Sequence, residues 1–258
     1  MTPTARLFSA LPLVLAALAA LVPGAARAQF NQETKLTASD AAAGDWFGYS
    51  VSISGDSALV GAVGNADAGR DSGSAYIFQR NQGGANAWGE VAKLTASDAA
   101  LGDHFGRSVG IWGDLAIVGA YGKDDAGRNS GSAYIYQRGQ GGANAWGELA
   151  KLTASGAAPG DQFGFSVGIW GDLALVGAYL DADAGRESGS AYIFQQKQGG
   201  ANAWGELVKI TASDGARFDA FGESVSISGD SAIVGAFRNA DADVGRFSGS
   251  AYIYTPEP

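Results

Sequence analysis

The chain has 258 residues, a formal net charge of −9, 46% hydrophobic and 10% aromatic residues, no cysteine and one histidine. This composition excludes wholesale disorder, disulfide scaffolds, zinc ribbons and cysteine nucleophiles, and a pI near 4.5 argues against nucleic acid as a partner. Glycine supplies 40 residues, which indicates many turns rather than long helices.

Residues 1–28 have the three parts of a secretory signal peptide. Arg6 is followed by the apolar run 7–22 and then by Ala26-Arg27-Ala28, a small-residue cleavage site. An uncleaved anchor helix is the alternative, but a bilayer span needs roughly 20 residues, more than this run offers. The pattern therefore predicts cleavage after Ala28 and a mature chain, 29–258, without a transmembrane segment. We expect it to be secreted, periplasmic or at the cell surface.

The mature chain repeats itself at a fixed interval. KLTASD begins at Lys35 and Lys93, KLTASG at Lys151 and KITASD at Lys209, so successive copies are 58 residues apart. Residues 93–150 and 151–208 are identical at 45 of 58 positions. Such similarity indicates that one structural unit is duplicated. The units are 35–92, 93–150, 151–208 and 209–254.

Each unit contains four segments with the character of strands. In the first unit these are Phe47–Ile53, Ser57–Ala62, Gly73–Phe78 and Trp88–Ala96, each bounded by turn residues. The first two are joined by a tight Ser54-Gly55-Asp56 turn. Four short antiparallel strands per unit are typical of one blade of a β-propeller.

The two ends of the mature chain complement each other. Residues 29–40 repeat the pattern of a fourth strand, whereas the last unit stops after its third strand at Tyr254. We therefore predict an all-β, four-bladed propeller of about 16 antiparallel strands, closed as a monomer when the N-terminal strand completes the last blade. The alternative is an open, curved array that closes by forming an oligomer.

Two short motifs recur in register in every unit. The first is Phe-Gly, at Phe47-Gly48, Phe105-Gly106, Phe163-Gly164 and Phe221-Gly222. The second is Val-Gly-Ala, at Val60-Gly61-Ala62, Val118-Gly119-Ala120, Val176-Gly177-Ala178 and Val234-Gly235-Ala236.

These motifs resemble the FG-GAP repeats of a family whose best-known members form the propeller of integrin α subunits. The resemblance implies a β-propeller fold. The chain departs from the family pattern at the Pro of GAP, which is replaced by Val63, Tyr121, Tyr179 and Phe237. The family's calcium-binding loop between the two motifs is also replaced, by a short SGD or WGD turn.

Antiparallel strands place the loop after the second strand and the link to the next unit at the same end of each blade. This end holds most of the differences between units and 16 of the acidic residues. We expect an acidic rim that contacts a ligand, with the following candidate residues: Trp46, Asp67, Asp71, Asp124, Asp125 and Glu187. The alternative is a set of solvated turns in which Asp and Gly only shape the loops.

Alternating oxygen ligands in two of these loops are weak calcium candidates. They are Asp181, Asp183, Asn239, Asp241 and Asp243. The third ligand position is Gly185 in one loop, so an Asx turn competes with metal binding, and the sequence predicts neither a committed metal site nor a cofactor.

The sequence favours a non-catalytic binding or adhesion module with a protein or glycan partner. The acids recur with the fold, the single histidine lies at a variable position, and neither pattern indicates a catalytic site. Two alternatives remain open: a structural component of the cell envelope or matrix, and a secreted enzyme that acts on polysaccharides. The C-terminal Pro256-Glu257-Pro258 resembles the opening of a bacterial sorting signal, which is a weak indication of surface targeting.

Overall fold

The computed structural model describes residues 32–198, 200, 203–240, 245 and 247–256. The chain divides into two units, residues 1–35 and 36–258. Residues 32–35, the described part of the first unit, have no regular secondary structure. The predicted signal peptide lies outside the described residues. The described residues contain no helix that is long and apolar enough to cross a membrane.

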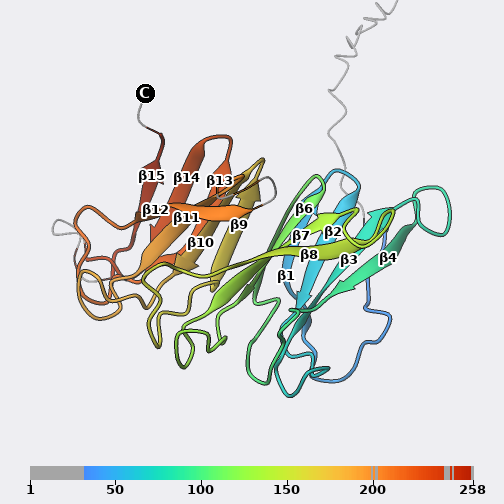
Figure 1. Cartoon of the computed structure of the whole chain (residues 1–258), viewed down its shortest axis with the longest axis horizontal. Coiled ribbons are helices and arrows are strands. Elements are labelled where there is room, and N and C mark those ends of the chain that lie inside the picture. The colour runs from blue at the N-terminus through green and yellow to red at the C-terminus, as the bar shows by residue number, and fades with distance from the viewer. Residues whose placement is uncertain (1–31, 199, 201–202, 241–244, 246, 257–258) are drawn as a thin grey trace, which may run out of the picture. The chain divides into compact units, whose positions relative to one another are not determined.

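The second unit consists of four antiparallel sheets, each built from strands that are consecutive in the chain (Figure 1). Sheet 1 contains β1 (Phe47–Ser54), β2 (Ser57–Ala62), β3 (Ser74–Arg80) and β4 (Trp88–Leu94). Sheet 2 contains β5 (Ser108–Trp112), β6 (Leu115–Ala120), β7 (Ser132–Arg138) and β8 (Trp146–Leu152). Sheet 3 contains β9 (Ser166–Trp170), β10 (Leu173–Ala178), β11 (Ser190–Gln196) and β12 (Trp204–Ile210). Sheet 4 contains β13 (Phe221–Ser228), β14 (Ser231–Ala236) and β15 (Ser250–Tyr254).

The all-β prediction and the blade-like sheets are confirmed, and the strands lie close to their predicted bounds. Ser54 pairs with Ser57 across the predicted tight turn, in which Gly55 has a φ of 56°. Glycine adopts this left-handed conformation without the steric cost of a Cβ atom. The repeated Ser-Gly-Asp or Trp-Gly-Asp therefore fixes the register of the first hairpin in every sheet.

Most of the core lies between neighbouring sheets. One hydrophobic cluster joins Leu59 and Ile77 of sheet 1 to Phe105 and Val109 of sheet 2. Equivalent clusters join sheet 2 to sheet 3 and sheet 3 to sheet 4. Most apolar residues are therefore buried where one sheet packs on the next, as expected for repeat proteins. A fourth cluster packs Val60 and Tyr76 of sheet 1 with Ala38 of the segment before β1.

The Phe-Gly and Val-Gly-Ala motifs meet at the junction between neighbouring sheets. Phe105 of sheet 2 bridges to Gly73 of sheet 1, and the Ser50 hydroxyl donates to the carbonyl oxygen of Gly106 at 2.8 Å. A Cβ atom on Gly61 would lie only 2.1 Å from that same oxygen. Glycine is required at Gly61 because the backbone of the next sheet passes directly over it.

Closure of the four sheets by an N-terminal strand is not confirmed. Residues 32–40 form no strand, and sheet 4 has three strands among the described residues. Val51 and Ile53 on sheet 1 are 70% and 68% exposed, and Ile253 on sheet 4 is 72% exposed. The terminal sheets therefore each leave uncovered an apolar face that interior sheets bury.

Candidate functional site

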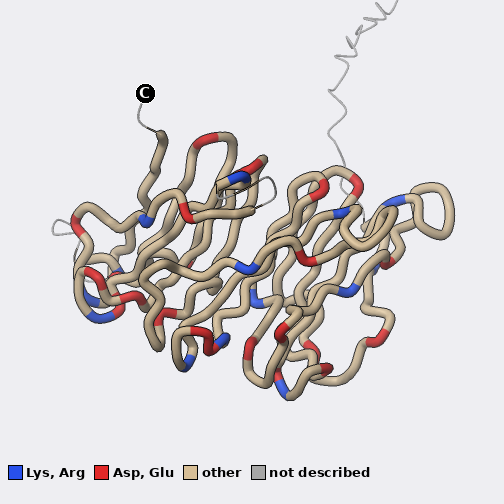
Figure 2. The backbone as a smooth tube through the Cα atoms, in the orientation of Figure 1, with Lys and Arg blue, Asp and Glu red and all other residues tan. Residues whose placement is uncertain are grey.

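The loops after the second strands and the links between sheets form one continuous surface, which we call the loop face. The backbone N–H of His104, in a link, donates to the carbonyl oxygen of Asp71 in the preceding loop at 3.0 Å. Gln162 donates to Asn129 in the same way at the next junction, also at 3.0 Å. The predicted placement of these segments at one end is thus observed, and Figure 2 shows many Asp and Glu residues on their loops.

Lysines from the fourth strands connect many of the acids on the loop face. In sheet 2, Lys151 Nζ donates to Asp98 Oδ2 at 2.7 Å and forms an ion pair with Asp125, while the Tyr134 hydroxyl donates to Asp98 Oδ1 at 2.7 Å. The equivalent groups of sheet 1 are Lys93 with Asp40, Asp67 and Tyr76. In sheet 3, Gly156 stands at the position of Asp98, and Lys209 and Tyr192 instead contact Asp181 of the loop after β10. Lys209 also forms an ion pair with Asp183.

These contacts keep the carboxylates of Asp98 and Asp40 charged. Burial opposes ionisation of Asp98, but hydrogen bonds from Lys151 and Tyr134 lower its pKa to about 2. The hydrogen bond from Lys93 likewise lowers the pKa of Asp40. A general acid needs a raised pKa, so these carboxyls are suited to holding the loops rather than to donating protons in a reaction.

All five predicted rim acids lie on the loop face, and each has a partner within the chain. Asp67 and Asp125 pair with the lysines described above. The carboxylate of Asp124 accepts a hydrogen bond from the backbone N–H of Asn129 at 2.7 Å. Asp71 forms an ion pair with Arg70 at 3.2 Å, and Glu187 pairs with Arg186 at 3.0 Å and with Arg238 at 3.5 Å. These acids thus shape the loops, whether or not they also contact a ligand.

The calcium candidates fall into two groups. Asp181 and Asp183 share the ammonium group of Lys209, which lies where a bound cation would be held. Asn239 donates its side-chain amide to Asp219 at 3.0 Å and accepts from the Ser250 hydroxyl at 2.9 Å. Asp241 and Asp243 lie outside the described residues. Within the described part of the chain, no group of three or more acidic or histidine side chains is placed to hold a metal ion.

Aromatic side chains cross the sheet junctions on the loop face. We call this group the aromatic track, and its members are Trp46, Tyr49, His104, Arg107, Tyr121, Phe165 and Tyr179. The guanidinium of Arg107 lies 5.1 Å from the ring centre of Tyr49 and 4.0 Å from that of Phe165. Arg107 of sheet 2 therefore links an aromatic ring of sheet 1 to one of sheet 3 through cation–π contacts.

Ring contacts extend the track on both sides of Arg107. Tyr121 stacks on His104 with ring centres 4.8 Å apart, and Phe165 lies 4.2 Å from Tyr179. Tyr121 also meets Phe165 edge-on at 5.6 Å. Burial lowers the pKa of His104, so its imidazole is neutral at physiological pH.

The backbone presents the first residue of this track in an unusual conformation. Trp46 and His104 have φ values of 55° and 56°, and Gln162 and Ala220 at the equivalent positions have 56° and 58°. A left-handed backbone at a residue other than glycine carries a steric cost. The same backbone thus carries four different side chains in four sheets, and Trp46 is 62% exposed.

Sequence reasoning found Trp46 but did not predict the rest of the track. The signal was present, since Tyr121, Tyr179 and Phe237 replace the Pro expected after each Gly-Ala. Tyr121, Tyr179 and Phe237 are separated from one another by at least 58 residues. Tyr121 contacts Phe165 only because sheet 2 packs on sheet 3.

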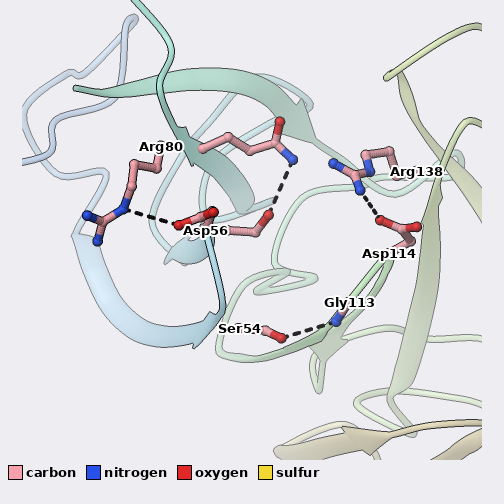
Figure 3. Close-up of a pocket in the computed structure, with 8 residues that line it drawn as sticks. Ser54, Asp56, Arg80, Gly113, Asp114 and Arg138 are labelled. Atoms are coloured by element: carbon pink, nitrogen blue, oxygen red, sulfur yellow. Dashed lines mark hydrogen bonds and ion pairs between the residues drawn. The ribbon is translucent and has the colours of Figure 1, made fainter. Parts of the chain in front are cut away.

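A polar pocket lies at the opposite end, between sheets 1 and 2 (Figure 3). Arg80 pairs with Asp56 at 3.2 Å, and Arg138 pairs with Asp114. The Ser54 hydroxyl accepts a hydrogen bond from the backbone N–H of Gly113 at 3.1 Å. Because each arginine already has a carboxylate partner, we interpret the pocket as part of the junction between the two sheets rather than as a ligand site.

The comparison with protein families covers most of the chain. Residues 30–78, 88–136, 146–194 and 204–254 each match the model of the FG-GAP repeat. The chain belongs to the FG-GAP repeat family. Each later match begins in the fourth strand of one sheet and ends in the third strand of the next, so the FG-GAP unit spans a sheet junction. A search of curated proteins finds no match.

The FG-GAP motif has a clear physical role at these junctions. Gly119 and Gly177 repeat the close approach seen at Gly61, because an added Cβ atom would lie 1.9 Å from the carbonyl oxygen of Gly164 or Gly222. The FG glycine of one sheet thus packs on the Gly-Ala glycine of the preceding sheet. The motif thus explains how one FG-GAP sheet packs on the next. The residue directly before its Phe differs from sheet to sheet.

Proposed function

We propose that this FG-GAP chain is a secreted, non-catalytic binding or adhesion module that contacts a protein or glycan partner through its loop face. One observation carries the proposal. Buried junction positions repeat almost unchanged, whereas loop-face positions with the same backbone carry different side chains, as at Trp46, His104 and Gln162. A repeated scaffold with varied, partly exposed end groups is typical of a recognition surface.

The location of the protein is part of the proposal. The predicted signal peptide, residues 1–28, supports export, and the absence of cysteine is compatible with an oxidising compartment. We place the mature protein outside the cytoplasm: secreted, periplasmic or at the cell surface. Detection of a mature chain that begins at Gln29 in the exported fraction would support this placement.

A structural role in an envelope or matrix is the second candidate, because both terminal sheets leave apolar faces uncovered. Ile233 of sheet 4 is 43% exposed, whereas the equivalent Ile117 of sheet 2 is fully buried. Faces of this kind favour self-association unless the chain covers them itself.

We propose that the chain covers these faces by closing into a four-bladed propeller. Gly48 of sheet 1 and Gly235 of sheet 4 are the two halves of a sheet junction that has no partner among the described residues. An added Cβ atom on Gly48 would meet nothing within 4 Å, and one on Gly235 would meet only atoms of Ser224. The same two halves are in contact at each of the three internal junctions.

The vacant place beside β15 supports residues 30–36 as the missing strand. An apolar groove of about 250 Å³ lies between sheets 3 and 4 and is lined by Leu207, Val208 and Tyr254. Leu207 and Val208 are 51% and 43% exposed, although the equivalent residues of sheets 1 and 2 pack against a neighbouring sheet. A fourth strand on β15 would cover them.

Charge supports the same assignment. The Tyr252 hydroxyl donates to Asp214 at 2.7 Å, as Tyr76 and Tyr134 do to Asp40 and Asp98. In sheets 1 and 2 a lysine of the fourth strand binds that same aspartate. Lys35 occupies the equivalent position in the N-terminal repeat of the pattern.

A cross-link tests closure directly, because the chain has no cysteine of its own. Ile193 pairs with Val208 in sheet 3, so the equivalent pair for a closed sheet 4 is Ile253 with Thr34. The double variant Thr34→Cys, Ile253→Cys should form a disulfide within one chain under oxidation, and light scattering should show a monomer. A disulfide between two chains, or the absence of any cross-link, would refute the closed monomer.

The binding function is tested with exposed residues. Asp181 is a poor choice because it is buried and bound to Tyr192 and Lys209. Asp124→Ala and Trp46→Ala change exposed side chains of the loop face, and Asp56→Ala at the opposite end is the matched control. Binding of labelled protein to cell-surface material should fall in the first two variants. Binding that is unchanged in both, or that falls equally in the control, would contradict the proposal.

A further inference from the structure

The nine tyrosines of the chain fall into two groups. The six on the third strands each donate the hydroxyl to a carboxylate or a carbonyl oxygen. The other three, Tyr49, Tyr121 and Tyr179, belong to the aromatic track, and no described residue is hydrogen-bonded to their hydroxyls. Tyr49 is 48% exposed, and Tyr121 and Tyr179 are half-buried. The track therefore offers phenolic hydroxyls that no described residue occupies, beside aromatic rings.

The hydroxyls of Tyr121 and Tyr179 are protonated at neutral pH. Burial raises the pKa of Tyr121 and that of Tyr179 above the usual value. Each hydroxyl is therefore able both to donate and to accept a hydrogen bond. Each lies beside a ring face held in place by its neighbours, since Tyr121 stacks on His104 and Tyr179 packs on Phe165.

The charges around the track are balanced. Arg107 lies within it, and Arg238 and Glu223 both act on Tyr179. Asp71 acts on His104, which is itself neutral. This part of the loop face therefore differs from the acidic loops around it and does not select strongly for a cationic or an anionic ligand.

We propose that the aromatic track binds a neutral oligosaccharide. The ring faces of Trp46, Tyr121 and Tyr179 pack against the apolar C–H faces of sugar rings. The free tyrosine hydroxyls and the guanidinium of Arg107 bind sugar hydroxyl groups. This assignment rests on the proposed binding function and names the class of its ligand. It places the main ligand contacts on the rings of the aromatic track rather than on the acidic rim.

The backbone around the track favours a saccharide over a peptide strand. The link and the preceding loop already use their N–H and carbonyl groups on each other, as between His104 and Asp71 and between Phe105 and Ser72. A peptide that adds a strand needs such groups free. A ligand must therefore bind this surface through its side chains, and the hydroxyl and guanidinium groups among them suit a ligand that is rich in hydroxyl groups.

Titration calorimetry of the full mature protein tests the assignment with hexamers of N-acetylglucosamine, glucose and mannose as neutral probes. An oligogalacturonate and poly-lysine serve as charged probes. The double variant Tyr121→Phe, Tyr179→Phe keeps both rings and removes only the hydroxyls. We expect at least one neutral hexamer to bind the parent protein. Its affinity for the double variant should be lower by a factor of about ten or more.

The opposite end of the sheets supplies a matched control. Trp112 and Trp170 are 38% and 41% exposed, with ring centres 6.0 Å apart. The Trp112→Ala, Trp170→Ala variant should bind the hexamer as the parent does. Equal loss in both variants, or no loss in the tyrosine variant, would overturn the assignment.

The charged probes separate this inference from the proposed function. Binding of poly-lysine without any neutral hexamer would overturn the oligosaccharide assignment and leave a binding module with a basic partner. If no probe binds, the oligosaccharide assignment is wrong. The binding function then fails only if cell-surface material is also not bound in the loop-face experiment.

Discussion

The first three strands of sheet 2 and the three strands of sheet 4 have similar sequences but very different surroundings. Ile117 and Ile135 of sheet 2 are fully buried between neighbours, whereas Ile233 and Ile253, their equivalents in sheet 4, are 43% and 72% exposed. The strands form in both sheets, so local pattern is enough for the hairpins. Burial, and with it most of the stabilisation, depends on whether a second sheet packs on the first.

The largest expected difference between these sheets comes from truncating their isoleucines. Ile135→Ala should reduce the free energy of unfolding by about 2–5 kcal/mol because it leaves a cavity in a closed core. Ile253→Ala should cost well under 1 kcal/mol if sheet 4 stays uncovered, and a cost close to that of Ile135→Ala if the ring closes. Denaturant unfolding of both variants measures the contrast.

The junction glycines give a second, smaller contrast. Gly119→Ala places a Cβ atom 1.9 Å from the Gly164 oxygen, and we expect a loss of about 1–3 kcal/mol. The Cβ atom of Gly235→Ala meets only atoms of Ser224, and the close one is the hydroxyl of a side chain that can rotate away, so the open arrangement predicts a much smaller effect. Equal losses in the melting temperature of the two variants would show that sheet 1 packs on sheet 4.

The tyrosine hydroxyls of sheets 2 and 4 give a third contrast. Tyr134→Phe removes a partly buried hydrogen bond from the buried Tyr134 to Asp98, and we expect it to cost about 1 kcal/mol. Tyr252→Phe removes the corresponding bond to Asp214 at a more exposed site, and it should cost less. Thermal unfolding compares the two, and a larger cost for Tyr252→Phe would contradict the ranking.

The smallest expected effect is on the stability of the protein at low pH. Folding lowers the pKa of Asp98 from 3.8 to about 2, so its stabilising contribution is present above about pH 4 and is lost as pH falls through about 2. The melting temperature of Asp98→Asn should therefore fall less than that of the parent between pH 5 and pH 2. Asp56→Asn, at an exposed carboxylate of the opposite end, is the control, and an identical acid response of the parent and Asp98→Asn would refute the role of this pair.

The acidic loops and the aromatic track differ in how far they could be foreseen. The sequence predicts that Asp67 and Asp125 lie at one end of the sheets, because the alternation of antiparallel strands sorts the loops without any knowledge of packing. It does not predict their lysine partners. Lys93 lies 26 residues after Asp67, and β4 must return beside β3 before the two meet.

The sequence by itself determined the strands, the repeat of 58 residues and the FG-GAP junction motif, since hydrophobic alternation, turn glycines and duplication are local properties of the chain. Only the tertiary structure decided which side chains from different sheets touch. It placed Arg107 between Tyr49 and Phe165 and left three tyrosine hydroxyls without a partner in the described chain. Such contacts depend on how one sheet packs on the next, which no single repeat encodes.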